Sequence, residues 1–367
     1  MTSRPADLLA RAVQGDLSWV DTESWDCEAL VRSSEHHGIT ALLWSALQGR
    51  PGSPAALVGR LGSAVTAEVA RSAVQERELA SVLRAFAEHG VDAIVVKGAA
   101  LAYTCYEQPW LRKRTDTDVL IEREWLEFAA GALGAAGYMP ATALSTGEFV
   151  SHQAAFERRD EHGVSHVVDV HWKAVNPQIL ADAVSFKSVR TGSRLVSRPG
   201  LTLRVPDPSW SLLLACVHRL AHHQDQERLG WLFDIHLLAR DLGASGWDHF
   251  IAIAAAQRVS AICADGLEAS MRLVGASVPG HVIQILKHAG QGDPSKAYTE
   301  REQPRLAVLR DDLRHLPRWR DRARLLREHA FPSASFMMSR YSGRRRAWLP
   351  AFYVHRLVTG AWKWMRT

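Results

Sequence analysis

Apolar and polar residues follow a helical period at both ends of the chain and a mixed pattern in the middle. Residues 1–90 repeat apolar side chains at helical spacing, with breaks at Gly38 and at the PGSP turn of residues 51–54. From Ala55 to His89 the pattern continues without a proline and stops at Gly90, which predicts one long helix or two stacked helices. Residues 1–90 are therefore predicted to form an N-terminal helical subdomain.

Residues 91–205 alternate between strand-like and helix-like segments. The runs VDAIVVK and TDVLI predict strands, and residues 99–106 and 124–137 predict helices. FVSHQAAFERR and VSHVVDVHW flank the turn-like DEHG, which predicts a hairpin, and RLVSR and LTLRV add two β-like pieces. The predicted class is α+β, with a small mixed β-sheet core over residues 91–205 flanked by N-terminal and C-terminal helical subdomains.

Helical spacing returns after the prolines at 206 and 208. The segments WSLLLACVHRLAHH and LGWLFDIHLLARDL predict two helices within a subdomain of residues 206–292, which we expect to close a cleft over the sheet. Residues 293–367 are rich in arginine and partly amphipathic, with a break at Phe331–Pro332. They are predicted to form a basic helical C-terminal region.

The composition is that of an ordinary soluble globular protein, with 47% hydrophobic and 23% charged residues among 367. Its four cysteines have no metal-ligand spacing, which favours free thiols in a reducing compartment. The N-terminus lacks the apolar run of a signal peptide, and no apolar stretch approaches about 18 residues. We expect a cytoplasmic protein without a transmembrane segment.

Positive charge is concentrated near the C-terminus. Residues 301–367 contain 16 Lys+Arg and 5 Asp+Glu, a net charge of +11, so the first 300 residues carry −6 of the overall +5. This asymmetry favours an anionic partner, which can be nucleotide phosphates, a nucleic acid or a membrane surface. The alternative is an arginine-rich helical surface that docks on the helical domain and otherwise faces solvent.

Three aspartates carry the strongest chemical signal. Asp116 and Asp118 alternate along a predicted strand, so their side chains are expected on one face, where a hard divalent cation would relieve their repulsion. Asp169 lies between Val168 and Val170 on another predicted strand, so it can point toward the same place. Three carboxylates on adjacent strands are typical of two-metal phosphoryl or nucleotidyl transfer.

Basic and polar residues flank this acidic group. Lys97 and Gly98 end the preceding strand, where glycine lets the backbone approach a phosphate and lysine neutralises it. With Arg112 they are predicted to contact a triphosphate. His218 and His222 are one helical turn apart but lack the HExxH pattern of a zinc site. His222 and Asp234 are instead predicted to line a nucleotide cleft, the alternative being packing between domains.

The segment from Val95 to Ile121 resembles the signature of an uncharacterised nucleotidyltransferase family of the polymerase-β-like superfamily. The resemblance extends over roughly residues 30–360, through a K-G-x-x-L turn, a Y-x-x-P-x-x-R loop, D-x-D and D-x-H-W strands, and helical H-x-x-x-H and W-L-x-D motifs. These motifs match Lys97, Gly98, Leu101, Tyr106, Pro109, Arg112, Asp116, Asp118, Asp169, His171, Trp172, His218, His222, Trp231, Leu232 and Asp234, and an FPS…RY…WLP pattern recurs at 331–333, 340–341 and 348–350.

The resemblance implies a small mixed sheet flanked by helices, two divalent cations (Mg²⁺ or Mn²⁺) and an NTP donor, with ATP expected. Most polymerase-β-like enzymes carry Gly-Ser shortly before the first aspartate, whereas here the turn is Gly98-Ala99 and lies further upstream. Phosphate binding is then expected from backbone N–H groups at the start of the helix, from Lys97 and from Arg112.

These observations predict a metal-dependent nucleotidyltransferase that moves a nucleoside monophosphate from an NTP to an acceptor hydroxyl and releases pyrophosphate. Asp116 and Asp118 would hold the metals, and Asp169 would complete the site or act as the base. A small molecule or peptide is favoured as acceptor over a protein or a nucleic acid. The alternatives are a kinase-like transfer of phosphate from the same site, or a non-catalytic nucleotide- or nucleic-acid-binding module.

Overall fold

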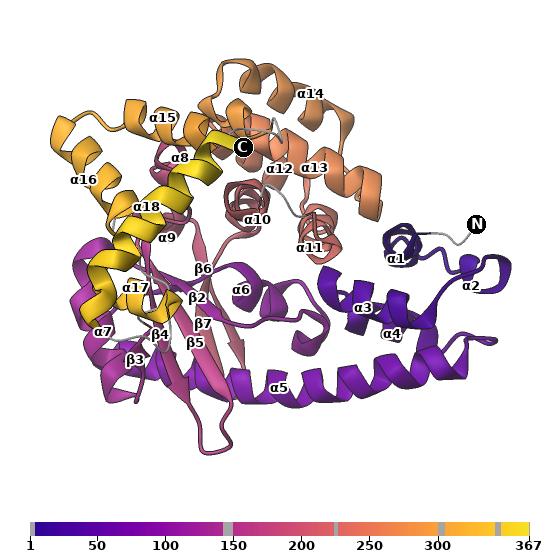
Figure 1. The fold of residues 1–367 in the computed structure, drawn as a ribbon. Helices are drawn as coiled ribbons and strands as arrows, with labels where there is room; N and C mark the ends of the chain where they lie inside the picture. The colour runs from indigo at the N-terminus through magenta and orange to yellow at the C-terminus, as the bar shows by residue number, and fades with distance from the viewer. Residues whose placement is uncertain (1–3, 142–149, 224–226, 300–304, 342–345, 367) are drawn as a thin grey trace.

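The computed structural model describes residues 4–141, 150–223, 227–299, 305–341 and 346–366, and it places a small mixed sheet among helices (Figure 1). This confirms the predicted α+β class. The strand order of the sheet is β1-β2-β5-β4-β3. The strands are β1 (Ile94–Val95), β2 (Thr117–Leu120), β3 (Met139–Pro140), β4 (Gln153–Arg159) and β5 (Ser165–His171).

The sheet is mixed because one central pair is parallel. β2 runs parallel to β5, while β1 pairs antiparallel with β2 and β4 pairs antiparallel with β5. The hairpin predicted at DEHG is confirmed: Asp160 accepts the backbone N–H groups of His162 and Val164, and Gly163 adopts a positive φ of 76°. The parallel pair requires a crossover, which the segment with β3 and β4 supplies.

The last two β-like pieces form a separate ribbon rather than extending the sheet. β6 (Ser193–Arg198) and β7 (Leu201–Pro206) pair antiparallel with each other. Leu201, Leu203 and Val205 alternate into the hydrophobic cluster beneath the sheet. The ribbon therefore covers the sheet through side chains instead of backbone hydrogen bonds.

One long helix, α5 (Ala55–Glu88), extends from the N-terminal helices to the sheet (Figure 1). It is a single helix, which resolves the two alternatives left by the sequence, and Gly90 follows it with φ 69°. Leu79, Val82 and Phe86 on α5 share a buried cluster with the valines of β2 and β5. The helices before it are α1 (Pro5–Val13), α2 (Trp19–Thr22), α3 (Cys27–His37) and α4 (Thr40–Gln48).

Short helices connect the strands, and a helical layer follows them. The connecting elements are α6 (Lys97–Thr104), η1 (Pro109–Leu111), η2 (Arg123–Trp125), α7 (Leu126–Ala135), α8 (Gln178–Ala181) and α9 (Phe186–Thr191). The layer comprises α10 (Pro208–His223), α11 (Leu229–Arg240), α12 (Ala244–Ala256), α13 (Ser260–Val274), α14 (Gly280–Ala289), η3 (Gly290–Gly292) and η4 (Pro294–Tyr298). One hydrophobic cluster joins this layer to α1, α3 and α4 and to Leu120 of the sheet.

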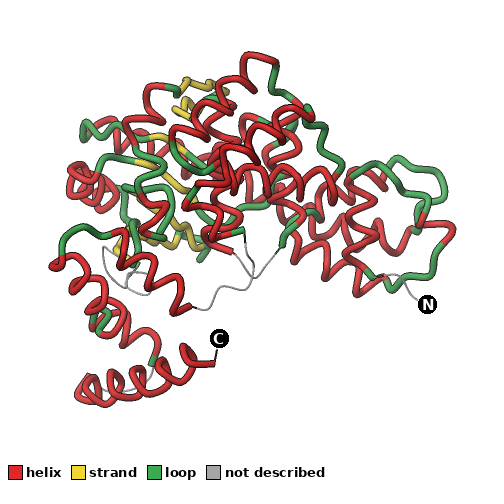
Figure 2. Tube along the Cα trace, turned by 90° about the horizontal axis from the view of Figure 1, so that it is seen from above, coloured by secondary structure: helices red, strands yellow, loops and turns green. Residues whose placement is uncertain are grey.

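The basic C-terminal segment forms α15 (Arg305–His315), α16 (Trp319–Ala330), α17 (Ala334–Arg340), η5 (Arg346–Trp348) and α18 (Leu349–Arg366). Figure 2 shows α18 at the outer edge of the molecule, beyond α16. Asp312 anchors α15 by accepting the backbone N–H groups of Gln178 and Ile179 at the start of α8, at 2.8 and 3.4 Å. Across the described residues, none of the helices has both the length and the apolarity needed to cross a membrane.

This anchor predicts a pH dependence of stability. Burial raises the pKa of Asp312 to about 6 from 3.8. A raised folded-state pKa gives stability that is present below 3.8 and is lost as the pH rises through about 6. Asp312→Asn keeps an acceptor oxygen without the charge, so its free energy of unfolding should not show this loss. The free energy of unfolding of the variant relative to that of the wild type should therefore rise by about 1 kcal/mol from pH 5 to pH 8.

Thermal unfolding at both pH values measures this effect. The neighbouring Asp311→Asn is the matched control, because the Asp311 carboxylate lies beside Arg310 and Arg314 rather than on a buried helix start. An equal pH dependence of Asp312→Asn and wild type would contradict the assignment.

Candidate active site

Two buried aspartates face each other across the parallel strand pair. In the β2–β5 register Asp118 stands opposite Asp169. Val119, Val168 and Val170 point into the hydrophobic cluster against α5, so the two carboxylates lie on the other face of the sheet. The two strands that carry these aspartates are therefore neighbours in the sheet, as the sequence predicts.

Lys97 and His171 surround the carboxylate of Asp118. The Lys97 ammonium donates to Asp118 Oδ1 at 2.7 Å, and His171 Nε2 lies 2.7 Å from the same oxygen. Lys97 Nζ is also 3.2 Å from His171 Nε2. Lys97 starts α6 with a positive φ of 53°, a conformation that costs about 1–3 kcal/mol for a residue with a Cβ. The strained backbone turn aims its side chain back over β2.

The three aspartates differ in charge state. Burial opposes ionisation of Asp118, but the Lys97 ammonium and the His171 hydrogen bond outweigh it and hold the pKa of Asp118 well below its usual range. Burial and the Asp118 and Asp116 charges raise the pKa of Asp169 to about 7. Burial and the Asp118 charge raise the pKa of Asp116 to about 6. The group therefore repels further negative charge and would be stabilised by a cation.

The donor set fits a divalent cation. Asp118, Asp169 and His171 each offer a ligand atom, and these atoms lie within 4.8 Å of one another. Gln153 donates to Asp169 Oδ2 at 3.0 Å, whereas Asp169 Oδ1 is buried without a donor among the described residues. A buried carboxylate oxygen without a donor is costly, and a cation would satisfy it.

Asp116 departs from the sequence prediction in one respect. It precedes β2, which begins at Thr117, so it is not part of the strand as predicted. It is also outside the compact donor group, where His171 joins the other two aspartates. Asp116 nevertheless lines the same cavity as Asp118 and Asp169.

Arg112 and Asp234 form a buried ion pair across the cavity wall. Arg112 Nε lies 2.8 Å from Asp234 Oδ1, one terminal nitrogen lies 2.7 Å from Oδ2, and the Tyr106 hydroxyl donates to Oδ1 at 2.7 Å. Burial opposes the charge of Arg112, but Asp234 outweighs it and raises the pKa of Arg112. The guanidinium also lies 3.6 Å from the position that a Cβ on Gly98 would take. Asp234 thus holds Arg112 over the start of α6.

A cavity of about 450 Å³ collects nearly all of these groups. Its walls include Lys97, Gly98, Arg112, Asp116, Asp118, Asp169, His218 and Asp234, together with Glu35, His37, Arg228 and Trp231. His218 packs edge-on against Trp231, with ring centroids 5.9 Å apart. His222 belongs to α10, but its side chain lies outside the described residues. The cavity therefore lies between the central strands of the sheet and α3, α10 and α11.

Sequence reasoning left His171 and Gln153 without a role, although both contact the acidic group. The signal for His171 was present: it stands two residues after Asp169, so both side chains lie on one face of β5. Gln153 gave no such signal, because its place opposite His171 depends on the hairpin register.

A family model described as an uncharacterised nucleotidyltransferase matches residues 23–287. The chain belongs to this family. The resemblance drawn from the motifs around Lys97 and Asp118 is confirmed, and the match ends before the C-terminal patterns at 331–350.

Comparison with solved structures gives an antigenic nucleotidyltransferase-like protein from Paracoccidioides brasiliensis. It is 13% identical, with a TM-score of 0.34, over 57% of this chain and 95% of that one. At this TM-score the likeness adds nothing to the residues described above. Comparison with curated proteins gives no match.

The ion pair predicts a large cost for Asp234→Ala. The substitution leaves the Arg112 guanidinium buried without its carboxylate, so we expect a loss of about 3–5 kcal/mol in unfolding free energy. Tyr106→Phe removes one of the hydrogen bonds to Asp234 and should cost about 1 kcal/mol. Urea unfolding measures both, and a cost of Asp234→Ala no larger than that of Tyr106→Phe would contradict the role of the pair.

A close backbone approach predicts a second cost at the cavity wall. A Cβ on Gly230 of α11 would lie 2.8 Å from the carbonyl oxygen of His37 at the end of α3. Gly230→Ala must push these helices apart and should destabilise by about 1–3 kcal/mol. Gly59→Ala in α5 meets nothing within 4 Å and should instead stabilise by about 0.4–1 kcal/mol. Thermal unfolding of both variants tests this, and a Gly230→Ala variant as stable as wild type would contradict it.

Proposed function

We propose that the chain is a metal-dependent nucleotidyltransferase, which transfers a nucleoside monophosphate from an NTP, with ATP expected, to an acceptor hydroxyl. The observation that carries this proposal is the buried pair of Asp118 and Asp169, which lines one cavity with Lys97 and in which Asp169 Oδ1 has no hydrogen-bond donor among the described residues. Membership of a nucleotidyltransferase family supports the same chemistry.

Asp118 and Asp169 would hold the cation, with Asp116 as a further carboxylate in the same cavity. Bound Mg²⁺ or Mn²⁺ supplies charge neutralisation for the triphosphate and for the leaving pyrophosphate. The His171 hydrogen bond orients Asp118, and the Gln153 amide orients Asp169 through Oδ2. These two contacts fix the carboxylates before substrate arrives, which limits reorganisation during the reaction.

Lys97 and the start of α6 are the groups placed to receive phosphate. The Lys97 ammonium neutralises Asp118 in this structure and lies at the helix start, where backbone N–H groups favour an anion. Arg112 lies over Gly98, so its charge borders the same place although Asp234 balances it. We therefore assign the direct phosphate contact to Lys97. We assign to Arg112 the positioning of the Gly98 turn at the start of α6.

In the proposed reaction the acceptor oxygen forms a bond to the α-phosphorus as the bond to pyrophosphate breaks. The proton of the acceptor hydroxyl passes to Asp169, whose carboxylate lines the same cavity. The products are the nucleotidylated acceptor, pyrophosphate and the released proton. The cavity, about 450 Å³ in volume, favours a small molecule or a peptide as acceptor over a nucleic acid.

Nucleotide turnover tests the proposal. The protein is incubated with Mg²⁺ or Mn²⁺ and each NTP, with small-molecule and peptide extracts as acceptors, and pyrophosphate and product mass are measured. Asp118→Asn and Asp169→Asn should each reduce turnover at least about 100-fold because each removes a charged group that stabilises the transition state. Asp160→Asn, in the hairpin turn, is the matched control.

Product mass separates the alternatives. Addition of a nucleoside monophosphate supports the proposal, whereas addition of phosphate alone would show a kinase. NTP binding without turnover, equal in wild type and both variants, would show a binding module instead. Absence of metal-dependent NTP binding, measured by calorimetry, would overturn the proposal altogether.

A further inference from the structure

The helices α15–α18 form a surface that the proposed catalytic site does not use; we call the described residues 305–341 and 346–366 the C-terminal arm. It carries most of the +11 charge of residues 301–367. Its acidic residues are largely engaged, since Asp312 caps α8 and Glu328 pairs with Arg324 and with the backbone of Val150. The arginines of α16 are exposed, and they make the outer surface of the arm cationic.

Large apolar side chains are exposed on the same helices. On α16, Leu325 and Glu328 are buried, while Trp319 is 72% exposed and Leu326 is 45% exposed. Trp319 and Leu326 are seven residues apart and therefore share one face of the helix. On α18, Val354 and Val358 are 61% and 65% exposed and also share a face. Such side chains next to arginines indicate a partner that is both apolar and anionic.

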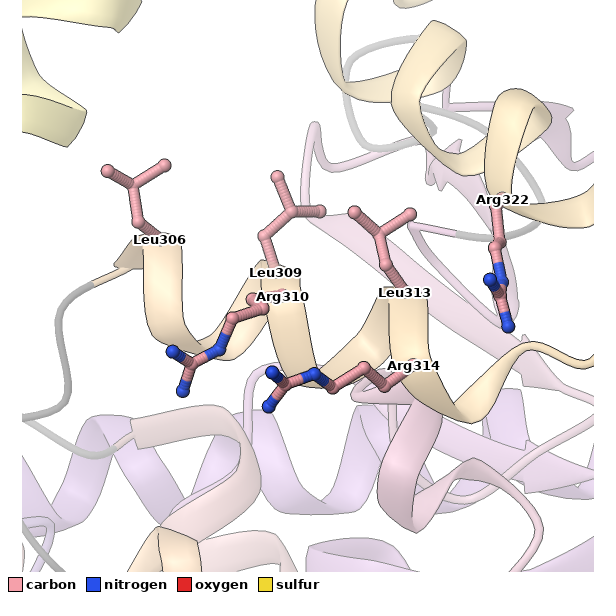
Figure 3. Close-up of a pocket in the computed structure, with 6 residues that line it drawn as sticks. All are labelled: Leu306, Leu309, Arg310, Leu313, Arg314 and Arg322. Atoms are coloured by element: carbon pink, nitrogen blue, oxygen red, sulfur yellow. The ribbon is translucent and has the colours of Figure 1, made fainter. Parts of the chain in front are cut away.

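A third apolar stripe lies on α15. Leu306, Leu309 and Leu313 point to one side of this helix, while Arg310 and Arg314 point to another (Figure 3). These residues and Arg322 of α16 line a hollow of about 410 Å³. Leu306 is exposed. It does not line the cavity that contains the candidate active site. The hollow therefore brings leucine and arginine side chains together, as the surface of α16 does.

The arm is also placed where a broad partner can reach it. Figure 2 shows α18, which leads to the C-terminus, at the outer edge of the molecule. Since Leu325 and Glu328 are the buried residues of α16, much of the surface of this helix stays accessible. An extended flat partner could therefore contact α16 and α18 without displacing the core.

We propose that the C-terminal arm binds the surface of an anionic lipid bilayer. Leucine, valine and tryptophan would enter the boundary between headgroups and acyl chains, and the arginines would contact the headgroup phosphates. A nucleic acid would match the arginines but offers nothing for exposed aliphatic side chains such as Val354 and Val358. A second copy of the chain would bring two strongly cationic arms together, which their repulsion disfavours.

Vesicle sedimentation of the full-length protein tests this proposal. The protein should pellet with vesicles of phosphatidylcholine mixed with phosphatidylglycerol, far less with phosphatidylcholine alone, and less as salt increases. Trp319→Ala combined with Leu326→Ala should weaken partitioning about tenfold because it removes exposed apolar area. Arg320→Ala and Arg327→Ala should each weaken it about fivefold.

Leu195→Ala is the matched control, because Leu195 is 60% exposed on β6, outside the arm. It should bind anionic vesicles as the wild type does. NTP turnover measured without vesicles should be unchanged in the arm variants, so this proposal and the catalytic one fail independently.

Four outcomes would overturn the proposal. The protein could stay in the supernatant with anionic vesicles, or the arm variants could pellet as the wild type does. Alternatively, a mixed-sequence RNA could compete the protein off the vesicles while the Trp319 and Leu326 substitutions leave RNA binding intact, which would assign the arm to nucleic acid. Analytical ultracentrifugation completes the comparison, since dimers lost in the arm variants would assign the surface to a second copy.

Discussion

The parallel pairing of β2 with β5 is the constraint on which the rest of the molecule depends. It places Asp118 directly opposite Asp169. The side chains of the neighbouring Val119, Val168 and Val170 then point to the other face of the sheet, into the hydrophobic core. Two facing buried carboxylates are unfavourable unless cations compensate them, and Lys97 does so here at the cost of a strained backbone. The hydrophobic cluster against α5 holds the strands together despite that repulsion, so core packing supports a locally unfavourable polar group.

Much of this arrangement could be read from local sequence pattern. The flanking valines fixed the face of Asp169, and the D-x-D spacing located a second acidic strand. The ends of the strands are harder to predict, because they depend on which residues of the neighbouring strand form hydrogen bonds. Asp116 has no partner in the β2–β5 register and precedes β2. The contact of His171 with Asp118 likewise depends on the register between two strands separated by a long crossover, which local pattern does not specify.

Long-range pairing explains the remaining differences. Arg112 was expected to be available to a triphosphate, but Asp234 from α11 takes up its charge in a bidentate contact. Both residues were recognised as candidates, yet their pairing joins segments 122 residues apart in sequence. Helical periodicity shows which face of α11 is buried and does not show which loop will lie against it. The walls of the candidate-site cavity therefore follow from the packing of the helices rather than from any one motif.

The backbone of Lys97 has a consequence for how this position can change over time. With φ at 53°, glycine is the residue best suited to the fold at this point, and every substitution by glycine would relieve strain while discarding the ammonium. Loss of the ammonium would also leave the buried Asp118 carboxylate without its cation, which costs about 3–5 kcal/mol and exceeds the backbone strain that glycine would remove. The backbone conformation therefore favours glycine at position 97 and the buried carboxylate favours lysine, and the ion pair is the larger of the two effects.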